Sequence, residues 1–234
     1  MYDICDIHSH VLPGMDDGCA TLEESLAVLK KMRQSGITRV FATPHYYARE
    51  TVAAFLQRRQ ESMALLAAAL TEDMPQLICG AEVAWFPGIS SLAELDQLCL
   101  GQSRYLLLEL PFTPWTKQVL RDVENLCLRG FVPILAHYER YAKVQSRQML
   151  ERMLDCEPLV QMNASRLLSI WSVGGACRDI QLDKVQLLGS DCHGLHHRPP
   201  RLGDAIAQLE KRKLHSALER MAALGEEIFR QARE

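Results

Sequence analysis

The sequence predicts an α/β fold in which seven parallel strands, joined by helical crossovers, close into a barrel. Short apolar runs alternate with amphipathic helical segments along the whole chain, which is the order typical of a parallel sheet. Most strand-like runs end on a polar residue, and the steps between the last five of these residues are 27, 28, 26 and 28. One strand and helix occupy about 30 residues. The length of 234 residues suits one barrel domain, residues 1–234.

The first half of the chain supplies four of the strands. They are predicted at residues 2–7, 38–43, 76–80 and 105–108. A capping box at Thr21 begins a helix that runs to Ser35 and is closed by Gly36. A long helix is predicted from about Thr51 to Leu70, and a short one at residues 92–99.

The second half supplies three more strands, at residues 132–136, 159–162 and 185–189. The amphipathic segment 116–128 is predicted to be a helix ended by Gly130, a residue suited to the left-handed position after a helix. A further helix is expected at 146–154. Residues 202–233 have helical periodicity throughout, so no eighth strand is predicted.

Composition limits the class of protein. The net charge of −3 and pI near 6.2 give no broad basic surface, so nucleic-acid binding is disfavoured. Strand-like sequence begins at Tyr2, without the regions of a signal peptide, and no apolar run reaches transmembrane length. None of the eight cysteines stands in Cys-x-x-Cys spacing, so they are interpreted as reduced thiols of a cytoplasmic protein.

The segment that suggests chemistry is Asp6-Ile7-His8-Ser9-His10. Side chains two apart on a strand point the same way, so His8 and His10 are expected to converge on one spot. Two histidines at this spacing are weak evidence alone. Barrel active sites lie where strands end, and the residues at the predicted strand ends are His8, His45, Glu82, Glu109, His137, Asn163 and Asp191.

Such a set of imidazoles and carboxylates suits manganese, zinc or iron. The candidate ligands exceed the needs of one ion, so two or three ions are expected, with Glu82 as a bridging carboxylate. Adjacent ions activate water and stabilise a phosphoryl displacement. Arg140 and Arg198 follow His137 and His193 closely, and a guanidinium matches phosphate oxygens.

These residues resemble a family. The resemblance, from Tyr2 to about Pro200, is to the polymerase and histidinol phosphatase superfamily, and within it to the bacterial metal-dependent protein-tyrosine phosphatases of capsule and exopolysaccharide synthesis. It rests on the segments Asp6–His10, Asp16–Gly18, Thr43–His45, Gly80–Glu82, Glu109–Leu110, Ala136–Arg140, Ser190–His193 and Arg198–Pro200.

The resemblance implies a distorted seven-stranded α/β barrel of the TIM type with three metal ions, often manganese. It implies hydrolysis of phosphotyrosine on a partner tyrosine kinase, by in-line attack of a metal-bound hydroxide. The implied ligands are His8, His10, Glu82 and Asp191 for one ion, Glu82, Glu109 and His137 for a second, and Asp17, His45 and His193 for a third. Arg140 and Arg198 would hold the phosphate, and with Asp191 and His193 they are the predicted catalytic residues.

The sequence departs from the family pattern at Tyr46, Tyr138, and Cys192 and Gly194, which flank His193. These departures remove no ligand but put the substrate contacts in question. Asn163 and Asp6 are expected to orient ligands. The adjacent His196 and His197 and the more distant His215 are interpreted as exposed.

Several alternatives stay open. Cys192 and Arg198 have the Cys-x5-Arg spacing of cysteine-dependent phosphatases, although Pro199 and Pro200 disfavour a phosphate-binding loop there. The same ligands could serve a small phosphomonoester such as histidinol phosphate. An exonuclease or a non-catalytic binding module of the same fold is disfavoured by the missing basic excess and by the complete ligand set. The sequence does not indicate an oligomeric state.

Overall fold

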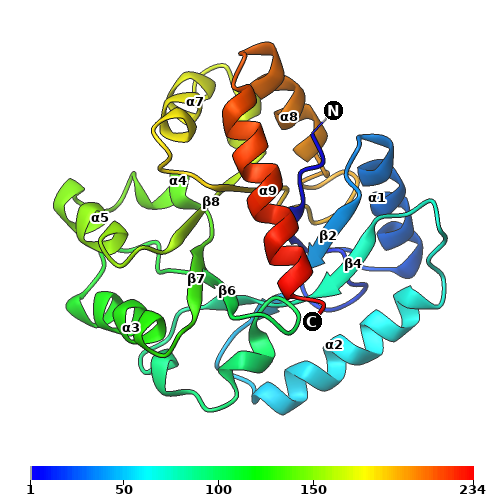
Figure 1. The fold of residues 1–234 in the computed structure, drawn as a ribbon. Coiled ribbons are helices and arrows are strands. Elements are labelled where there is room, and N and C mark those ends of the chain that lie inside the picture. Colours follow the sequence, from blue (N-terminus) through cyan, green and yellow to red (C-terminus); the bar gives the residue numbers. More distant parts are fainter. Residues whose placement is uncertain (1) are drawn as a thin grey trace.

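The computed structural model describes residues 2–234 (Figure 1). These residues form nine strands, and neighbouring strands are parallel: β1 (Asp6–Ser9), β2 (Arg39–Ala42), β3 (His45–Tyr46), β4 (Gln76–Cys79), β5 (Glu82–Ala84), β6 (Tyr105–Glu109), β7 (Val132–Leu135), β8 (Leu159–Asn163) and β9 (Leu187–Gly189). One sheet has the order β1-β2-β4 and the other the order β3-β5-β6-β7-β8-β9. The fold is therefore α/β, with a curled parallel sheet.

Helices connect the strands: α1 (Leu22–Gln34), α2 (Val52–Ala67), α3 (Lys117–Leu128), α4 (Tyr138–Tyr141), α5 (Arg147–Leu154), α6 (Ser165–Leu168), α7 (Val173–Gln181), α8 (Leu202–Lys211) and α9 (His215–Gln231), with 3-10 turns η1 (Ile89–Ser91) and η2 (Leu95–Leu98). Four of them begin at a threonine or serine whose hydroxyl accepts a hydrogen bond from a first-turn N–H: Thr21, Thr51, Thr116 and Ser146. The predicted starts of these four helices are thus confirmed.

The structure divides two of the predicted strands. Two predicted strands, 38–43 and 76–80, are each interrupted and continue in the second sheet as β3 and β5. The ladder survives the interruption, because Gly80 N donates to Ala42 O (2.9 Å) and Glu82 N to Pro44 O (3.0 Å). Within residues 2–234 the strands therefore form nine segments in two sheets, and the count of seven strands stays a prediction.

Backbone contacts also join the first strand to the segment after the last. His10 N donates to Cys192 O (3.0 Å), Asp191 N donates to His8 O (2.9 Å), and Ser9 forms a parallel bridge with Cys192. The two ends of the strand array therefore meet at the residues on which the predicted site depends.

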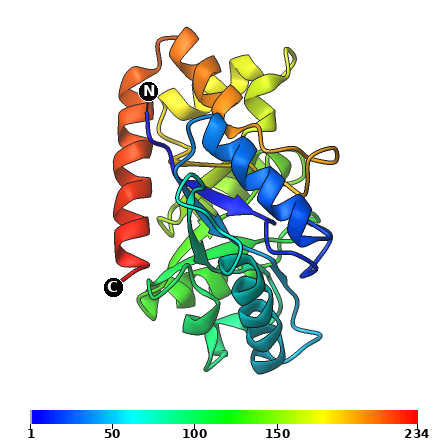
Figure 2. The ribbon, with the colours of Figure 1, turned by 90° about the vertical axis from the view of Figure 1, so that its right-hand side faces the viewer.

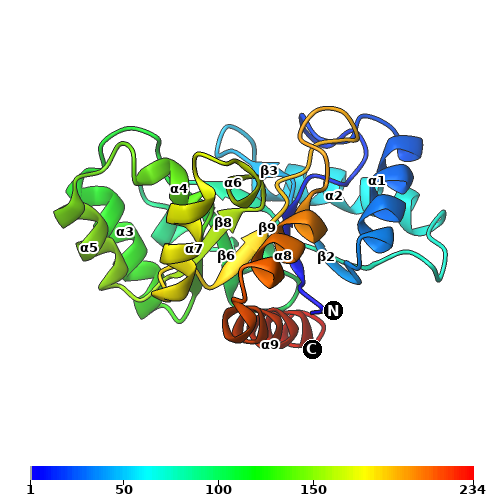
Figure 3. The same ribbon diagram turned by 90° about the horizontal axis from the view of Figure 1, so that it is seen from above.

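The interior beneath that site is apolar. One buried cluster takes a side chain from each of several strands and closes against α9; it contains Cys5, Ile7, Phe41, Leu100, Leu107, Ile134, Ala136, Leu187, Ile228, Phe229 and Ala232. In Figures 2 and 3, α9 lies along one side of the strands, and the loops that follow β1 and β9 lie on the opposite side. The helix thus closes the interior on one side and leaves the other for polar residues.

The first strand is irregular where it enters the site. Three residue steps of β1, from Asp6 to Ser9, pair with two steps of β2, from Val40 to Ala42. One extra residue in a strand re-aims the side chains on either side of it. Ile7 therefore packs in the apolar interior cluster, while its neighbour His8 also faces inward, toward Gln161 and Glu82.

Other differences lie in short or polar segments. The predicted helix 202–233 is two helices, α8 and α9, separated near Lys213, whose φ is 60°. The helices α4, α6 and α7 were not predicted; α4 and α6 have four residues each, too few to show a period. None of the helices within residues 2–234 combines the length and apolarity needed to cross a bilayer.

Candidate metal centre

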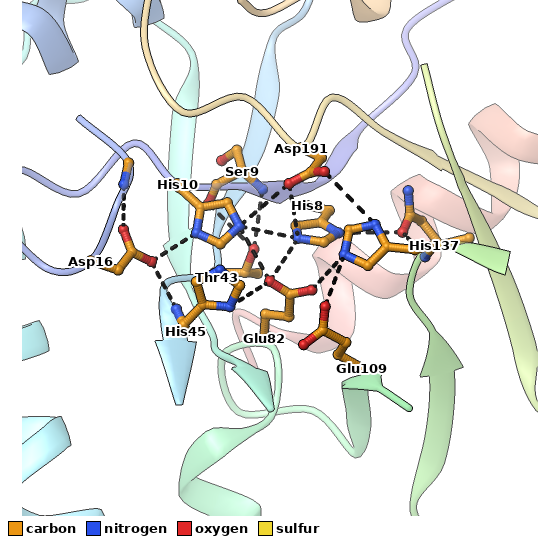
Figure 4. Close-up of polar contacts among 12 residues, drawn as sticks. His8, Ser9, His10, Asp16, Thr43, His45, Glu82, Glu109, His137 and Asp191 are labelled. Atoms are coloured by element: carbon orange, nitrogen blue, oxygen red, sulfur yellow. Dashed lines mark hydrogen bonds and ion pairs between the residues drawn. The ribbon is translucent and has the colours of Figure 1, made fainter. Parts of the chain in front are cut away.

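The nine predicted ligands lie together at the ends of the strands, opposite α9. His8, His45, Glu82 and Glu109 belong to β1, β3, β5 and β6; His10, Asp17, His137, Asp191 and His193 stand in the segments that follow β1, β7 and β9. Figure 4 shows most of these side chains pointing toward one another. The topology therefore brings together every residue that the sequence singled out as a ligand.

The Glu82 carboxylate is the centre of this cluster. Its side chain is fully buried, and Oε2 lies 3.2 Å from His8 Nε2, 3.3 Å from His10 Nε2 and 2.9 Å from His45 Nδ1. Its other oxygen, Oε1, lies 2.8 Å from His137 Nε2, which is itself 3.6 Å from Glu109. Four imidazoles from three segments of the chain thus surround a single carboxylate.

Three of these histidines, and His193 beside them, make a hydrogen bond through their Nδ1 atom. Four Nδ1 atoms face acceptor oxygens: His8 with Gln161 Oε1 (3.3 Å), His10 with Asp16 Oδ2 (2.7 Å), His137 with Asn163 Oδ1 (3.1 Å) and His193 with Asp191 O (3.0 Å). An acceptor requires the proton on Nδ1, so the network assigns the lone pair of the neutral ring to Nε2. In each case that lone pair faces the cluster.

The orientation of the two amides supports this assignment. Gln161 Oε1 accepts from the His137 N–H (3.1 Å), and Gln161 Nε2 donates to Asn163 Oδ1 (2.9 Å). Asn163 Nδ2 in turn donates to Asp191 Oδ2 (2.7 Å). Each oxygen and nitrogen of this chain has a matching partner, so neither amide can be turned without breaking a bond.

Sequence reasoning missed Gln161 and Asp16. Gln161 lies on β8 two residues before Asn163, and the period of a strand would have placed both on one face. Asp16 precedes the predicted ligand Asp17 and holds the imidazole of His10, the His45 N–H (2.8 Å) and the Gly18 N–H (2.9 Å). Partners of this kind orient a ligand and raise its basicity.

Hydrogen bonds among the described residues do not satisfy every polar atom of the cluster. Glu82 Oε2, His45 Nδ1 and His193 Nε2 are buried without a hydrogen-bond partner among the described residues, and buried polar groups seldom remain so. The Nε2 atoms of His8 and His10 lie only 3.2 Å apart, and the network assigns a lone pair to both. Lone pairs and carboxylate oxygens that converge in this way fit divalent cations.

The charges of the cluster agree with a cation site. Burial disfavours a charged Glu82, but the facing histidines, His8 first, hold its pKa well below the ordinary value. Burial also opposes protonation of His10, yet Asp16 and Glu82 outweigh it and raise the pKa to about 10. The first shift keeps Glu82 anionic, and the second favours positive charge on the His10 ring beside it. A metal ion bound to the lone pair on His10 Nε2 would supply this positive charge in place of the proton.

The groupings differ in part from the predicted ones. Candidate ligand atoms within 4.8 Å of one another occur in four sets: His8, His10 and Glu82; His8, His137 and Asp191; His45, Glu82 and Glu109; and His10, Asp17, His45 and His193. His10 thus joins the predicted set of Asp17, His45 and His193, and His45 faces two sets. The distribution of ligands over individual ions stays a prediction.

Two arginines lie over the cluster and meet at Asp191. Arg140 Nη2 is 3.3 Å from Asp191 Oδ2, and Arg198 Nη1 is 2.8 Å from Asp191 Oδ1. Their side chains are 39% and 35% exposed, whereas Asp191 is buried. Each guanidinium therefore has one side on the cluster and another open to an incoming anion.

Three of these residues have left-handed backbone conformations, with φ of 57° at His137, 50° at Asp191 and 48° at Arg198. A non-glycine residue in this region costs of order 1 kcal/mol and is concentrated at functional sites. The strain turns the chain sharply after β7 and β9. It aims the side chains that follow these strands back over their ends.

The remaining sequence predictions have clear outcomes. Cys192 is fully buried, and burial raises the pKa of its thiol well above the ordinary value; both features disfavour a thiolate nucleophile. Asp6 does not bind an imidazole: Oδ1 accepts from the backbone N–H groups of His8 (3.3 Å) and Ser190 (2.9 Å). His196, His197 and His215 are exposed, as predicted.

The chain is similar to a described family and to named relatives. The family model described as "Capsular polysaccharide synthesis, CpsB/CapC" matches residues 4–226. The tyrosine-protein phosphatase YwqE of Bacillus subtilis is 27% identical over 216 residues, covering 88% of this chain and 84% of the relative. The tyrosine-protein phosphatase CpsB of Streptococcus pneumoniae is 26% identical over 224 residues, covering 88% and 90%.

The fold has a counterpart among solved structures. A crystal structure from work on YwqE of Bacillus subtilis and CpsB of Streptococcus pneumoniae, described there as unique metal-dependent tyrosine phosphatases, superposes with a TM-score of 0.83. The match covers 97% of this chain and 95% of that one at 23% sequence identity.

The role of Asp16 yields a first test. Asp16→Asn would remove the anionic acceptor that fixes His10, so we expect the affinity for Mn²⁺ to fall by about 10- to 100-fold. The measurement is a calorimetric titration of the metal-stripped protein. Asp204→Asn, at an exposed pair with Arg201, should bind as the wild type does; equal affinity in both variants would contradict the role of Asp16.

Proposed function

Because the chain belongs to the CpsB/CapC family of capsular polysaccharide synthesis, we propose that it is a metal-dependent phosphatase that hydrolyses phosphotyrosine on proteins. The names of the curated relatives support this reaction. The observation that carries the proposal is the buried Glu82 carboxylate ringed by imidazole nitrogens, with two arginines over it that remain open to an anion.

The residues proposed to hold the metal ions are those predicted from the sequence: His8, His10, Asp17, His45, Glu82, Glu109, His137, Asp191 and His193. Bound divalent ions supply positive charge for a developing phosphate dianion and lower the pKa of water. We propose two or three ions, with manganese first and zinc or iron as alternatives. Imidazole with carboxylate ligands suits all three.

The chain's own contribution is to bind and orient the phosphoryl group. Arg140 and Arg198 approach opposite oxygens of Asp191, so their guanidinium groups are already directed at one point. A phosphate placed there would accept hydrogen bonds from both, with the planar fork matching its oxygens. Because Asp191 already holds the two arginines in place, they need little rearrangement when a phosphate binds.

His193 is proposed as the fourth catalytic residue. Its Nε2 is buried, without a hydrogen-bond partner among residues 2–234, and lies 3.4 Å from Asp17 Oδ1. Burial, together with the charge on His10, lowers the pKa of His193 to about 4. The ring is therefore neutral at pH 7 and can offer a lone pair to the site.

We extend the proposal to the form of the barrel, the protein substrate and the cellular compartment. We interpret β2 with β3 and β4 with β5 as two interrupted strands, which gives a distorted seven-stranded barrel, and residues 1–234 as one domain. The substrate is proposed to be a bacterial tyrosine kinase of capsule or exopolysaccharide synthesis. All eight cysteines are free thiols, which supports a reducing, cytoplasmic compartment.

Metal dependence distinguishes this mechanism from a thiolate one. Chelation should abolish phosphate release from a phosphotyrosine peptide, and added Mn²⁺ should restore it, because the site lacks another source of Lewis acidity. Cys192→Ala should retain most of the activity. Initial rates of phosphate release measure both effects, and the thermal midpoint of the variant reports its folding. Activity that resists chelation and disappears in a folded Cys192→Ala protein would contradict the proposal.

The arginines can be tested with a neighbouring control. Arg198→Lys keeps the charge but loses the planar fork, so kcat/KM on the peptide should fall by about 100-fold. Arg201→Lys changes an arginine three residues away that pairs with Asp204 at the surface and should leave kcat/KM unaltered. If both variants keep wild-type activity, Arg198 does not hold the phosphate.

A further inference from the structure

We propose that Phe112 forms the subsite that receives the aromatic ring of the substrate tyrosine, so that it selects aryl over alkyl phosphate esters. The inference rests on the proposed phosphatase function and adds a specificity residue that the sequence reasoning did not identify. Its basis is the position of an exposed aromatic side chain beside the arginine proposed to hold phosphate.

Phe112 lies at the edge of the metal centre. Its ring is 6.2 Å from that of His137, and the Arg140 guanidinium carbon is 5.3 Å from the Phe112 centroid. The residue is 42% exposed, so part of its ring is accessible from solvent beside the arginine proposed to hold phosphate. The Arg140 guanidinium thus lies over the Phe112 ring, and the exposed part of the ring is next to the predicted phosphate position.

The loop that carries Phe112 is held firmly. Leu110 N donates to the hydroxyl of the fully buried Tyr141 (2.8 Å). Gln145 accepts from Trp115 N (2.8 Å) and donates to Thr113 O (2.8 Å). These hydrogen bonds hold the backbone on both sides of Phe112 against Tyr141 and Gln145.

The Phe112 ring is also supported from below. It stacks on the Tyr141 ring at 5.8 Å with an interplanar angle of 26°, and Trp115 packs edge-on against the same tyrosine. Pro111 and Pro114 further restrict the chain. An aromatic surface that is fixed before binding costs little entropy to use.

The chemistry of the substrate fits this position. In a phosphotyrosine, one ester oxygen joins the phosphorus to the ring, so a phosphoryl group held by Arg140 and Arg198 places the ring within contact distance of Arg140's neighbours. Phe112 is such a neighbour, and two aromatic rings in offset or edge contact attract each other beyond the burial of their area. Phosphoserine and phosphothreonine carry no ring to make this contact.

A second aromatic residue at the rim is the main competitor. The Tyr47 ring lies 5.3 Å from that of His45, and it has Arg49 over it at 5.0 Å. Arg49 is not one of the two arginines that approach Asp191. A phosphate held at Asp191 therefore places a ring by Phe112 rather than by Tyr47, which makes Tyr47 a useful comparison.

The experiment compares Mn²⁺-loaded wild type, Phe112→Ala, Phe112→Tyr, Tyr47→Ala and Leu182→Ala. It measures kcat and KM on a phosphotyrosine peptide, and the inhibition constant of inorganic phosphate, which has no ring. Phe112→Ala should raise KM by roughly ten-fold with little change in kcat, because it removes binding shared by ground and transition states. Its phosphate inhibition constant should stay that of the wild type.

The other variants complete the test. Phe112→Tyr should restore the wild-type KM, and Leu182→Ala, which truncates an exposed leucine between α7 and β9, should leave it unchanged. An unchanged KM in Phe112→Ala, a parallel rise of KM and the phosphate inhibition constant, or a ten-fold rise in Tyr47→Ala alone would overturn the inference. Absence of wild-type turnover would instead refute the proposed phosphatase function.

Discussion

The site depends on the burial of one carboxylate among imidazoles. Glu82 lies at the start of β5, fully enclosed, with nitrogen atoms of His8, His10, His45 and His137 within 3.3 Å of its two oxygens. A buried anion is costly unless positive charge compensates it. The hydrogen bonds made by the opposite side of three of these rings direct lone pairs toward the carboxylate. A cation is the group that satisfies both at once.

The fold is arranged to hold that cluster still. The apolar cluster closed by Ile228 and Phe229 of α9 lies on the side of the interior away from the site. Because the pairing of β1 is irregular, Ile7 packs in this apolar cluster while its neighbour His8 contacts Glu82 in the polar site. The positive φ angles at His137 and Asp191 turn the chain within two residues of the ends of β7 and β9, and Arg198 has the same backbone conformation later in the segment that follows β9. Hydrophobic burial elsewhere thus offsets a strained, polar end of the sheet.

The sequence predicted what depends on local patterns and on strand ends. Thr21 and Gly130 marked helix ends because capping is a local property. Most of the ligand residues could be found because each stands at or just after the end of a predicted strand. The role of Gln161 was missed because a single glutamine in an otherwise apolar strand does not by itself indicate a functional residue. The breaks after β2 and β4, and the extra residue in β1, depend on how neighbouring strands pair, which no single segment specifies. The role proposed for Phe112 likewise depends on its contacts with Tyr141 and Arg140, which the sequence does not reveal.

The central claim is that the Glu82 cluster is built around divalent cations. The most direct test is a crystal structure of the protein with bound Mn²⁺, with anomalous differences recorded to locate the ions. The account predicts at least two manganese peaks, one of them within bonding distance of a Glu82 carboxylate oxygen and of imidazole nitrogens of His8 and His10. Manganese that is absent from Glu82 at saturating concentration, or bound only to surface carboxylates, would contradict it.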